Sequence, residues 1–412
     1  MDFDTLYTTY THTLRGKRKS VDALEFGFHL ERNLVRLYND VNRRELQPRP
    51  YTFISPYPKP REVFAADFGT KVIQQYIEEI LRPEAERRLS PRIFNNRKGK
   101  GNVACINQVI TDIYYASRGF TRDCWIIKVD MKGYFPNASQ DIAYQHLCDM
   151  AKASCNGDEL IEMEYLIAVN IYHRAAEYAY RKSARHLWED IPAEKSLFSK
   201  PAGTGGAIGH LIWQLAMTYY MNDVVMWLSS FAKVSVYMDD ITIVTDNKEM
   251  ALSMIPELRR RLHNLGVTLH SHKFYCQHYT KGVEVVGRHI KMDRVYVNNR
   301  CVRRAFEKLK MYNQRVSASQ SEKFMACANS YLGIFKTCNG YSIVRRYIAA
   351  INPRWWEYVT YDDARKCINV KQEYRRRNRI VQHYNLQKYY GKRKKNRREG
   401  KRDTNPQGVS LK

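Results

Sequence analysis

The sequence predicts an α+β protein in which helices pack on one face of an antiparallel sheet. Two observations indicate this class. Short runs rich in β-branched residues occur far apart in the chain, among them "WIIKVD" (125–130) and "VSVYMDDITIV" (234–244). Much of the remaining chain has apolar residues at helical spacing. With 412 residues, the chain is long enough for two or three domains that each enclose a core.

The composition favours a polyanionic partner. The chain has 68 Lys and Arg against 42 Asp and Glu, which gives a formal net charge of +26. Solubility does not require so large an excess, whereas a nucleic acid complements it. We therefore expect nucleic acid to be the main partner.

The cysteines and the hydrophobic runs indicate the compartment. The nine cysteines form no CxxC pair, so we expect reduced core residues and neither a zinc site nor a disulfide framework. No apolar run approaches the roughly 18 residues of a membrane span, and the N-terminal stretch lacks a signal-peptide pattern. These features predict a soluble, intracellular, cytoplasmic protein with no membrane partner.

The first third of the chain alternates between helical and extended patterns. Residues 20–46 begin as an amphipathic helix, with Ser20 before an acidic first turn. The segment "YTFISPYPKPREVF" is extended and punctuated by prolines, and a second helix follows it. "RIFNNRKGKGNVACI" (92–106) is typical of a basic, glycine-bearing loop, and residues 124–137 form a β-rich run that stops at Asp130.

The rest of the chain returns to strands once before it becomes helical again. Residues 141–190 are mostly helical in pattern, and residues 199–224 form a glycine-rich loop that leads into a helix. Strands are expected over 234–244 and in the short runs "VTLH", "VEVVGRHI" and "RVYVN". Beyond about residue 300 the pattern is helical. Residues 371–412 carry 15 Lys and Arg against 3 Asp and Glu, hence a charge near +12.

The most informative stretch is "VSVYMDDITIV". Its halves are two short strands, and "MDD" fits the tip of a tight hairpin, so Asp239 and Asp240 lie at the turn. Such a pair is most often a solvated turn. Here the strand "WIIKVD" also ends in an aspartate, and pairing the two strands brings Asp130 next to Asp239. Crowded carboxylates repel each other unless a cation such as Mg²⁺ screens them. The three acids therefore predict a two-metal site for phosphoryl transfer.

These motifs resemble those of bacterial and phage reverse transcriptases. "YMDD" and the upstream "DMKGYF" resemble the palm, "KPREVFAADF" and "RKGKG" the two fingers motifs, and "GGAIGHLIWQ" the template-contacting motif. "LGVTLHSHK" and "GVEVVGRHI" resemble the following helix and strand and the primer-grip hairpin, and the resemblance covers roughly residues 20–340. "QHYTKGVEVVG" and "NSYLGIFKTCNGYSIVRR" are most similar to the enzymes of diversity-generating retroelements, with defence-associated reverse transcriptases a close second.

The resemblance implies a right-hand polymerase fold with fingers, an antiparallel-sheet palm and a helical thumb. The expected segments are fingers (1–120), the first catalytic strand of the palm (121–140), a helical insertion of fingers or palm (141–200), the rest of the palm (201–298), the thumb (299–370) and a basic C-terminal tail (371–412).

The resemblance also assigns roles around the carboxylates. Asp130 and Asp239 are expected to be the principal metal ligands, whereas Asp240 either tunes the site electrostatically or binds metal only in some states. Phe135 matches the aromatic steric gate that excludes a ribose 2′-hydroxyl. Tyr134 is the alternative gate, or a core residue.

Basic residues are assigned to phosphate contacts by the same resemblance. Arg61 and Lys98 are expected to bind the nucleotide triphosphate, and Arg97 and Lys100 the template backbone, although "RKGKG" alone could also be a solvated basic turn. Lys273 matches a lysine near the leaving pyrophosphate, where it would supply a proton; alone it could be a surface residue.

The glycine-rich motif is expected to lie beneath the templating base. Gly209 permits close approach of the backbone to the template, and the amide of Gln214 can hydrogen-bond the nucleotide. Trp213 departs from the family, which commonly has a serine there. We expect Trp213 to turn into the helix core, because "QLAMTYYM" offers apolar neighbours.

The implied activity is synthesis of cDNA from dNTPs on an RNA template, with two Mg²⁺ ions for which Mn²⁺ could substitute. Further expected partners are a non-coding RNA and an accessory protein, and the oligomeric state stays open. Two other hypotheses remain. The first is an antiphage enzyme that makes cDNA from an associated non-coding RNA. The second is a non-catalytic RNA-binding scaffold, which predicts a broken acid triad.

Two C-terminal features allow different interpretations. Trp355 and Trp356 in "RWWEY" could stack on single-stranded bases or belong to a helical core or a subunit contact. The basic tail could be a disordered arm that adds phosphate contacts, or it could fold on a structured RNA.

Overall fold

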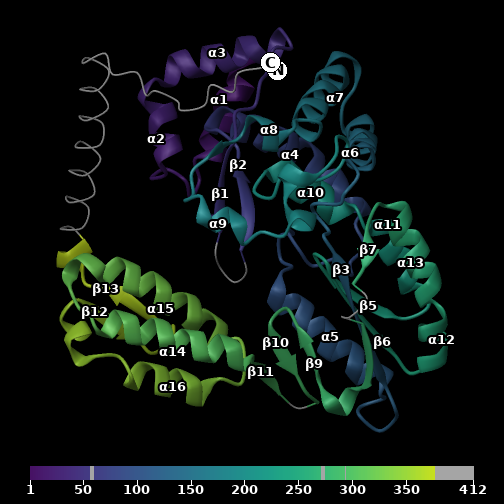
Figure 1. Cartoon of the computed structure of the whole chain (residues 1–412), viewed down its shortest axis with the longest axis vertical. Coiled ribbons are helices and arrows are strands. Elements are labelled where there is room, and N and C mark those ends of the chain that lie inside the picture. Colours follow the sequence, from purple (N-terminus) through teal and green to yellow (C-terminus); the bar gives the residue numbers. More distant parts are fainter. Residues whose placement is uncertain (56–59, 271–273, 293, 376–412) are drawn as a thin grey trace. The chain divides into compact units, whose positions relative to one another are not determined.

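The computed structural model describes residues 1–55, 60–270, 274–292 and 294–375 (Figure 1). The chain divides into two compact units, Met1–Val286 and Gly287–Lys412. Each unit has its own hydrophobic core. The division falls inside the expected palm segment 201–298, ahead of the boundary expected between palm and thumb.

The first unit contains most of the helices. They are α1 (Phe3–Thr13), α2 (Val21–Phe28), α3 (Leu30–Asn42), α4 (Phe68–Arg88), α5 (Asn102–Ala116), α6 (Gln140–Ser154), α7 (Gly157–Ile171), α8 (Ala175–Tyr178), α9 (His186–Glu189), α10 (Leu211–Tyr219), α11 (Asn222–Ser229), α12 (Lys248–Ser253) and α13 (Ile255–Asn264). The segment 141–200 is mostly helical, as its pattern predicts.

The first unit also contains strands that form two sheets, with one further strand, β9, near its end. They are β1 (Tyr51–Ser55), β2 (Arg61–Ala65), β3 (Trp125–Lys132), β4 (Tyr180–Arg181), β5 (Lys233–Tyr237), β6 (Asp240–Thr245), β7 (Thr268–Leu269), β8 (Tyr275–His278) and β9 (Val283–Val285).

The larger sheet is antiparallel, which confirms the expected class. Its order is β5-β6-β3, and β7 and β8 both pair with the remaining edge of β3. Helix α5 packs against β5 and β6, and α11 packs against β5. Strand residues such as Ile127, Ile241 and Ile243 are fully buried in the core of the unit. Hydrophobic burial on this scale holds the register of the sheet, because a slip by one residue would turn these side chains to the other face.

The smaller sheet has the order β2-β1-β4. Strands β1 and β2 are antiparallel, and β4 joins β1 in parallel, with Tyr51 opposite Tyr180. Strand β4 lies inside the segment that we expect to be mostly helical. A strand of two residues is too short to show alternation in the sequence. It is recognised only by its pairing with the edge of β1 in the folded chain.

The amphipathic segment 20–46 is divided into two helices. α2 ends at Phe28, and His29 adopts φ −126° and ψ 46°, outside the helical region, before α3 begins. The side chain of Asn33 donates to the carbonyl of Phe26 at 2.8 Å, which satisfies one of the carbonyls at the end of α2. Gly27 lowers the helical stability at this point.

The second unit is helical with two short hairpins. Its elements are β10 (Arg288–Ile290), β11 (Val295–Val297), α14 (Asn299–Asn313), α15 (Ser321–Phe335), α16 (Tyr341–Ala349), β12 (Val359–Asp362) and β13 (Cys367–Val370). Strands β12 and β13 pair antiparallel, and the expectation of a purely helical segment beyond about residue 300 was wrong for them. Alternation in "VTYD" and "CINV" around a polar turn is the signal that could have predicted this hairpin.

The tryptophan pair contributes to the core of the second unit. Trp355 is fully buried, and its ring stacks on Phe324 with centroids 4.3 Å apart and planes 14° apart. Trp356 packs against the same cluster. Trp355 is therefore unavailable for stacking on bases, and the core interpretation applies to it.

All nine cysteines are free thiols, and four of them are buried, as the absence of paired spacing predicts. Within the described ranges, no helix combines the length and the apolar character needed to cross a membrane.

Candidate active site

The hairpin that carries the adjacent aspartates is formed as its sequence predicts. Strands β5 and β6 pair antiparallel up to Tyr237 and Asp240, so Met238 and Asp239 make the turn. Met238 has a positive φ of 57°, which is uncommon for a side chain other than glycine. Its amide donates to the side-chain oxygen of buried Asn95 at 3.1 Å. The side-chain amide of Asn95 in turn donates to Thr218 of α10 at 3.0 Å.

The third carboxylate reaches the hairpin through strand β3. In the antiparallel pairing of β3 with β6, the direct partner of Asp130 is Asp240. The expectation put Asp130 next to Asp239, and the ladder continues in that direction, since the amide of Met131 donates to the carbonyl of Asp239 at 3.2 Å. Direct cross-strand partners project to the same face of a sheet. The register therefore gathers the three aspartates at one end of the sheet.

Burial and mutual repulsion perturb the turn carboxylate. Burial raises the pKa of the Asp239 carboxyl, and the nearby Asp130 carboxylate raises it further. The positive charge of Arg61 acts on the pKa of Asp239 in the opposite direction. The positive groups of the protein therefore offset the negative charge of Asp239 only in part.

Asp240 has a specific partner that Asp239 lacks. It forms an ion pair with Lys128 of β3, whose side chain is only 10% exposed and whose Nζ also lies 3.3 Å from Thr242 Oγ1. Burial raises the pKa of Asp240, and Lys128 works against this increase. Sequence reasoning missed Lys128. The available signal was a lysine in an apolar strand, two residues before Asp130 and therefore on the same face.

The carboxylates do not converge into a complete ligand set. Among the residues that the structure describes, no group of three or more His, Cys, Asp or Glu side chains could hold a metal ion. Asp240, the direct partner of Asp130 in the ladder, forms its ion pair with Lys128 instead.

The two candidate gate residues occupy different environments. Tyr134 is 5% exposed, and its hydroxyl donates to the carbonyl of Met217 at 2.7 Å. This placement favours the core alternative for Tyr134, because its polar atom is satisfied inside the core. Phe135 is only partly buried at the edge of the same core.

Two basic side chains of the loop "RKGKG", those of Arg97 and Lys100, bond to other groups of the protein. Arg97 is paired with Glu86 at 2.7 Å, donates to the carbonyl of Ser90 at 2.7 Å, and has a side chain 7% exposed. In this arrangement the guanidinium of Arg97 stabilises the loop itself, and its assignment to the template stays a prediction. Lys100 donates to the carbonyl of Pro91 at 2.9 Å and lies over the ring of Phe94. Lys98 is exposed.

The glycine-rich motif is held against the fingers strand β2. The amide of Phe64 donates to the carbonyl of Ile208 at 2.7 Å. Gly209 has φ +110°, and a Cβ on it would lie 2.5 Å from the carbonyl oxygen of Phe64. This position requires glycine for both its conformation and its space. Gln214 lies partly buried on α10, one turn beyond.

Trp213 turns into the core, as its apolar neighbours predict. Its side chain is 1% exposed, and the ring packs so closely on Gly206 that a Cβ there would lie 2.4 Å from it. The bulk of Trp213 is thus accommodated by a glycine of the preceding loop.

A buried polar network lies at the start of α10, beside the glycine-rich motif. Sequence reasoning missed this network. Gln74 of α4 is fully buried and accepts a hydrogen bond from the amide of Leu211 at 2.9 Å. Its amide group donates to Asn170 at 3.0 Å and to the ring of His210 at 3.2 Å. Burial lowers the pKa of His210 to about 3, so the ring is neutral and can accept this bond. A glutamine on the buried side of an apolar helix was the available signal.

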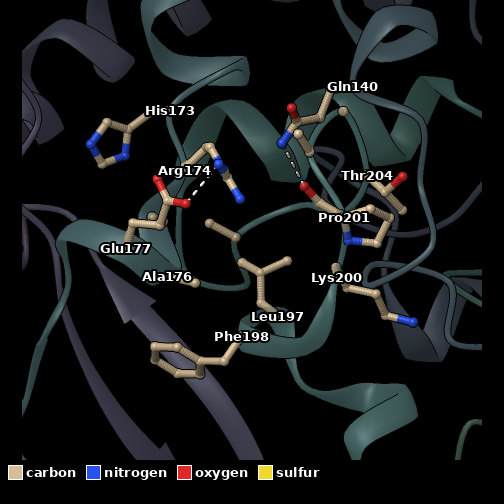
Figure 2. Close-up of a pocket in the computed structure, with 15 residues that line it drawn as sticks. Gln140, His173, Arg174, Ala176, Glu177, Leu197, Phe198, Lys200, Pro201 and Thr204 are labelled. Carbon is tan, nitrogen blue, oxygen red and sulfur yellow. Dashed lines mark hydrogen bonds and ion pairs between the residues drawn. The ribbon is translucent and has the colours of Figure 1, made fainter. Parts of the chain in front are cut away.

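A cavity of about 120 Å³ lies beside the glycine-rich loop that precedes α10 (Figure 2). Gln140 donates to the carbonyl of Gly205 at 3.1 Å, and Arg174 pairs with Glu177 at 2.7 Å (Figure 2). The aspartates do not line this cavity. Its polar groups serve the loop, and we assign it no catalytic role.

Two assignments lie outside the described residues. These are Lys273 and the part of the basic tail from residue 376 onward.

Comparison with known proteins identifies the family. The profile described as reverse transcriptase (RNA-dependent DNA polymerase) matches residues 58–290, more than half of the chain. No curated protein matches the chain. Among solved structures, apo telomerase from Candida tropicalis truncated from its C-terminal domain aligns at 12% identity and TM-score 0.41, over 60% of this chain and 55% of that chain. Telomerase from Candida albicans in complex with the TWJ fragment of telomeric RNA aligns at 12% identity and TM-score 0.41, over 77% of this chain and 57% of that chain.

The chain thus spans just over half the length of these two telomerase chains. The matched region 58–290 includes strands β2, β3, β5 and β6 and all three aspartates. The chain belongs to the reverse transcriptase family, and it has a right-hand polymerase fold.

Proposed function

We propose that this chain is an RNA-directed DNA polymerase that copies an RNA template into cDNA. The observation that carries the proposal is the register of β3 against β6, which gathers Asp130, Asp239 and Asp240 from segments more than a hundred residues apart. A non-catalytic scaffold would have no need of these charges, which repel one another.

The carboxylates suit a divalent cation. Asp239 is partly buried, and the neighbouring charge of Asp130 raises its pKa, so a cation at this point would relieve an unfavourable arrangement. Hard oxygen ligands favour Mg²⁺, with Mn²⁺ as a substitute. Asp130 and Asp239 would hold two such ions, and Asp240 would join them only after leaving Lys128. When bound, the ions would stabilise the charge that develops on the reacting phosphate.

The chain's own groups position the substrates. In the reaction, the primer 3′-oxygen forms a bond to the α-phosphorus of a dNTP, and the bond to pyrophosphate breaks. Arg61 and exposed Lys98 would bind the triphosphate, and the field of Arg61 already reaches Asp239. Lys273 would protonate the departing pyrophosphate. Phe135 would exclude a ribose 2′-hydroxyl, and Gly209 and Gln214 would support the templating base and the nascent pair.

Primer extension tests the activity. The wild-type chain should incorporate dNTPs on a primed RNA template with Mg²⁺. Asp130→Ala alone, or Asp239→Ala combined with Asp240→Ala, should abolish incorporation while RNA binding persists. Asp246→Ala is a matched control, because Asp246 is exposed directly after β6, at the opposite end of the strand from the site. Wild-type incorporation by Asp130→Ala would refute the site assignment.

We further propose that the enzyme serves a diversity-generating retroelement in the cytoplasm, together with its cognate RNA and an accessory protein. Support comes from the motif resemblance and from Trp213, whose core position leaves the surface of α10 beside Gln214 free of added bulk. If the pocket supports the nascent base pair poorly, the free-energy difference between correct and incorrect pairs becomes smaller. Each decrease of about 1.4 kcal/mol in that difference raises the error rate tenfold.

Deep sequencing of cDNA made with the cognate RNA tests this setting. Errors concentrated at template adenines would support it. Errors spread evenly over the four bases, or a low-complexity product copied repeatedly from a short template, would instead support an antiphage enzyme that uses an associated non-coding RNA.

A further inference from the structure

The turn that carries Asp239 has an unfavourable backbone conformation. Met238 precedes Asp239 in the turn between β5 and β6, and its φ is 57°. A residue with a Cβ atom loses free energy in this left-handed region, and methionine lacks the short polar side chain with which asparagine or aspartate offsets that loss. A contact from outside the hairpin is therefore needed to hold the turn, and with it Asp239, in place.

Asn95 makes such a contact from a distant part of the sequence. It is 2% exposed, and its Oδ1 accepts a hydrogen bond from the amide of Met238 at 3.1 Å. Its Nδ2 donates to the hydroxyl of Thr218 on α10 at 3.0 Å. The orientation of the side-chain amide is fixed by these two bonds, because a flip would set its NH2 group against the N–H of Met238. The position therefore needs a side chain that accepts and donates at the same time.

The backbone just before Asn95 is bound to the same hairpin. Ile93 and Val236 of β5 form an isolated parallel bridge. The amide of Phe94 donates to the carbonyl of Val236 at 3.0 Å, and the amide of Val236 donates to the carbonyl of Arg92 at 2.9 Å. These bonds fix the segment 92–94 along β5, so the side chain of Asn95 reaches the turn from a well-defined position.

The hydrogen bonds of Asn95 continue into α10. Thr218 is 1% exposed, and its hydroxyl donates to the carbonyl of Gln214 at 2.7 Å. The side-chain amide of Asn96 also donates to this hydroxyl, at 3.2 Å. With two donors and one acceptor, the hydroxyl uses its full hydrogen-bonding capacity. Three consecutive bonds thus connect the amide of Met238 with the carbonyl of Gln214, on the helix that we expect to support the nascent pair.

We propose that Asn95 is a positioning residue for catalysis, which holds Met238 in the left-handed conformation and thereby keeps Asp239 near Asp130. The inference rests on the proposed polymerase function. Asn95 acts through the backbone of Met238. Without its hydrogen bond, the turn is free to adopt the conformations that methionine prefers, and Asp239 spends part of its time out of place. The loss should therefore fall on the chemical step and not on the binding of dNTP.

The first test is a double-mutant cycle between Asn95 and Met238, measured by primer extension with the full chain. Asn95→Ala should lower kcat about tenfold or more and change the KM for dNTP by no more than about twofold. Met238→Gly should rescue this loss, because glycine adopts a positive φ without steric cost. In the Met238→Gly background, Asn95→Ala should therefore lower kcat by only about threefold or less. General destabilisation of the fold would produce the same loss in both backgrounds.

Asn222→Ala is the matched control. Asn222 is also buried, and it accepts from the amide of Ser90 at 2.8 Å and donates to the carbonyl of Arg88 at 3.3 Å. Its bonds hold the chain shortly before Asn95 without reaching the turn. Asn222→Ala should lower the melting temperature, keep kcat within about twofold of the wild type, and show no coupling to Met238→Gly. Variants are compared only if their circular dichroism matches that of the wild type, and Asn95→Ser, which is too short to make both bonds, replaces Asn95→Ala if the latter does not fold.

Hydrogen–deuterium exchange provides a second readout that is independent of catalysis. Mass spectrometry follows residues 234–244 in the full chain without metal, dNTP or nucleic acid. Asn95→Ala should accelerate exchange in this segment about tenfold and leave residues 359–370 of the second unit unchanged. Faster exchange in a chain that never extends a primer would refute the polymerase and keep the contact that holds the turn.

Three results would overturn the proposal. The first is wild-type kcat in folded Asn95→Ala. The second is an equal loss of kcat with and without Met238→Gly, which would make Asn95 a residue of the fold alone. The third is unchanged exchange over residues 234–244, which would mean that the turn keeps its conformation without Asn95.

Discussion

Lys128 forms an ion pair with Asp240 across strands β3 and β6, while the adjacent Asp239 lies at the turn near Asp130. Burial and the charge of Asp130 raise the pKa of both neighbouring carboxyls. The two differ because the buried Lys128 compensates Asp240, whereas the closest acid, Asp130, opposes the charge of Asp239.

This difference predicts opposite effects on stability. In buffer without divalent metal, Asp239→Asn should raise the melting temperature by about 2 °C, because it removes a charge opposed by Asp130. Asp240→Asn should lower the free energy of unfolding by about 2 kcal/mol, because it leaves Lys128 without its partner. Thermal and urea unfolding measure both. Equal shifts of the same sign would contradict the separation of the two carboxylates.

The pH dependence provides the control for that prediction. Burial and Asp130 raise the pKa of Asp239 in the folded state above its ordinary value of 3.8. The folded state therefore binds the proton more tightly, and the contribution of this group to stability falls as pH rises through the raised pKa. The gain from Asp239→Asn should be present at neutral pH and vanish below the ordinary value, where Asp239 is protonated in both states.

Phe135 and Tyr134 should respond differently to truncation. Phe135→Ala should increase incorporation of ribonucleotides relative to deoxynucleotides, because it removes the steric barrier to the 2′-hydroxyl. Tyr134→Ala should instead cost about 3 kcal/mol of stability, since it leaves a core cavity and an unpaired Met217 carbonyl. The discrimination ratio and the unfolding free energy separate the two effects. An unchanged ratio in Phe135→Ala would exclude it as the gate.

Gly209 should be intolerant of alanine. Gly209→Ala meets both the positive φ and the Phe64 carbonyl, so we expect loss of activity and a stability loss above about 2 kcal/mol. Gly203→Ala is the matched control, because Gly203 has φ +76° and open space around its Cβ position. It should cost only about 1 kcal/mol. Similar losses in both variants would mean that backbone strain alone explains them.

Substitution of two arginines should have different effects, one on nucleotide binding and the other on stability. Arg61→Ala should raise the dNTP concentration needed for half-maximal rate by about tenfold and leave stability unchanged. Arg97→Ala should destabilise the chain by about 2 kcal/mol, because Glu86 and two carbonyls lose their donor. Steady-state kinetics and thermal unfolding measure the pair. A kinetic defect in Arg97→Ala without a stability loss would restore it as a template contact.

The basic tail should act through charge. Deletion of residues 388–412 should weaken RNA binding and flatten its dependence on salt, since each phosphate contact contributes close to one unit of log–log slope. Extension of a short primed template should survive. An unchanged slope in filter binding would mean that the deleted residues do not contact the RNA.

The sequence by itself determined the strands that carry Asp130, Asp239 and Asp240, and the turn between β5 and β6. Strand alternation and tight turns depend on residues close in the chain, so a local pattern is sufficient to predict them. The net charge and the resemblance to reverse transcriptases were also visible in the sequence, because motif order requires no coordinates.

Only the tertiary structure decided which residues contact one another. Register made Asp240 the neighbour of Asp130 and brought Lys128 to it. Burial placed Tyr134 in the core, and Glu86 became the ion-pair partner of Arg97. Tyr51 and Tyr180 became neighbours through a two-residue strand. These pairings join segments distant in sequence, and the free energy of each depends on burial and distance, which a local pattern does not contain.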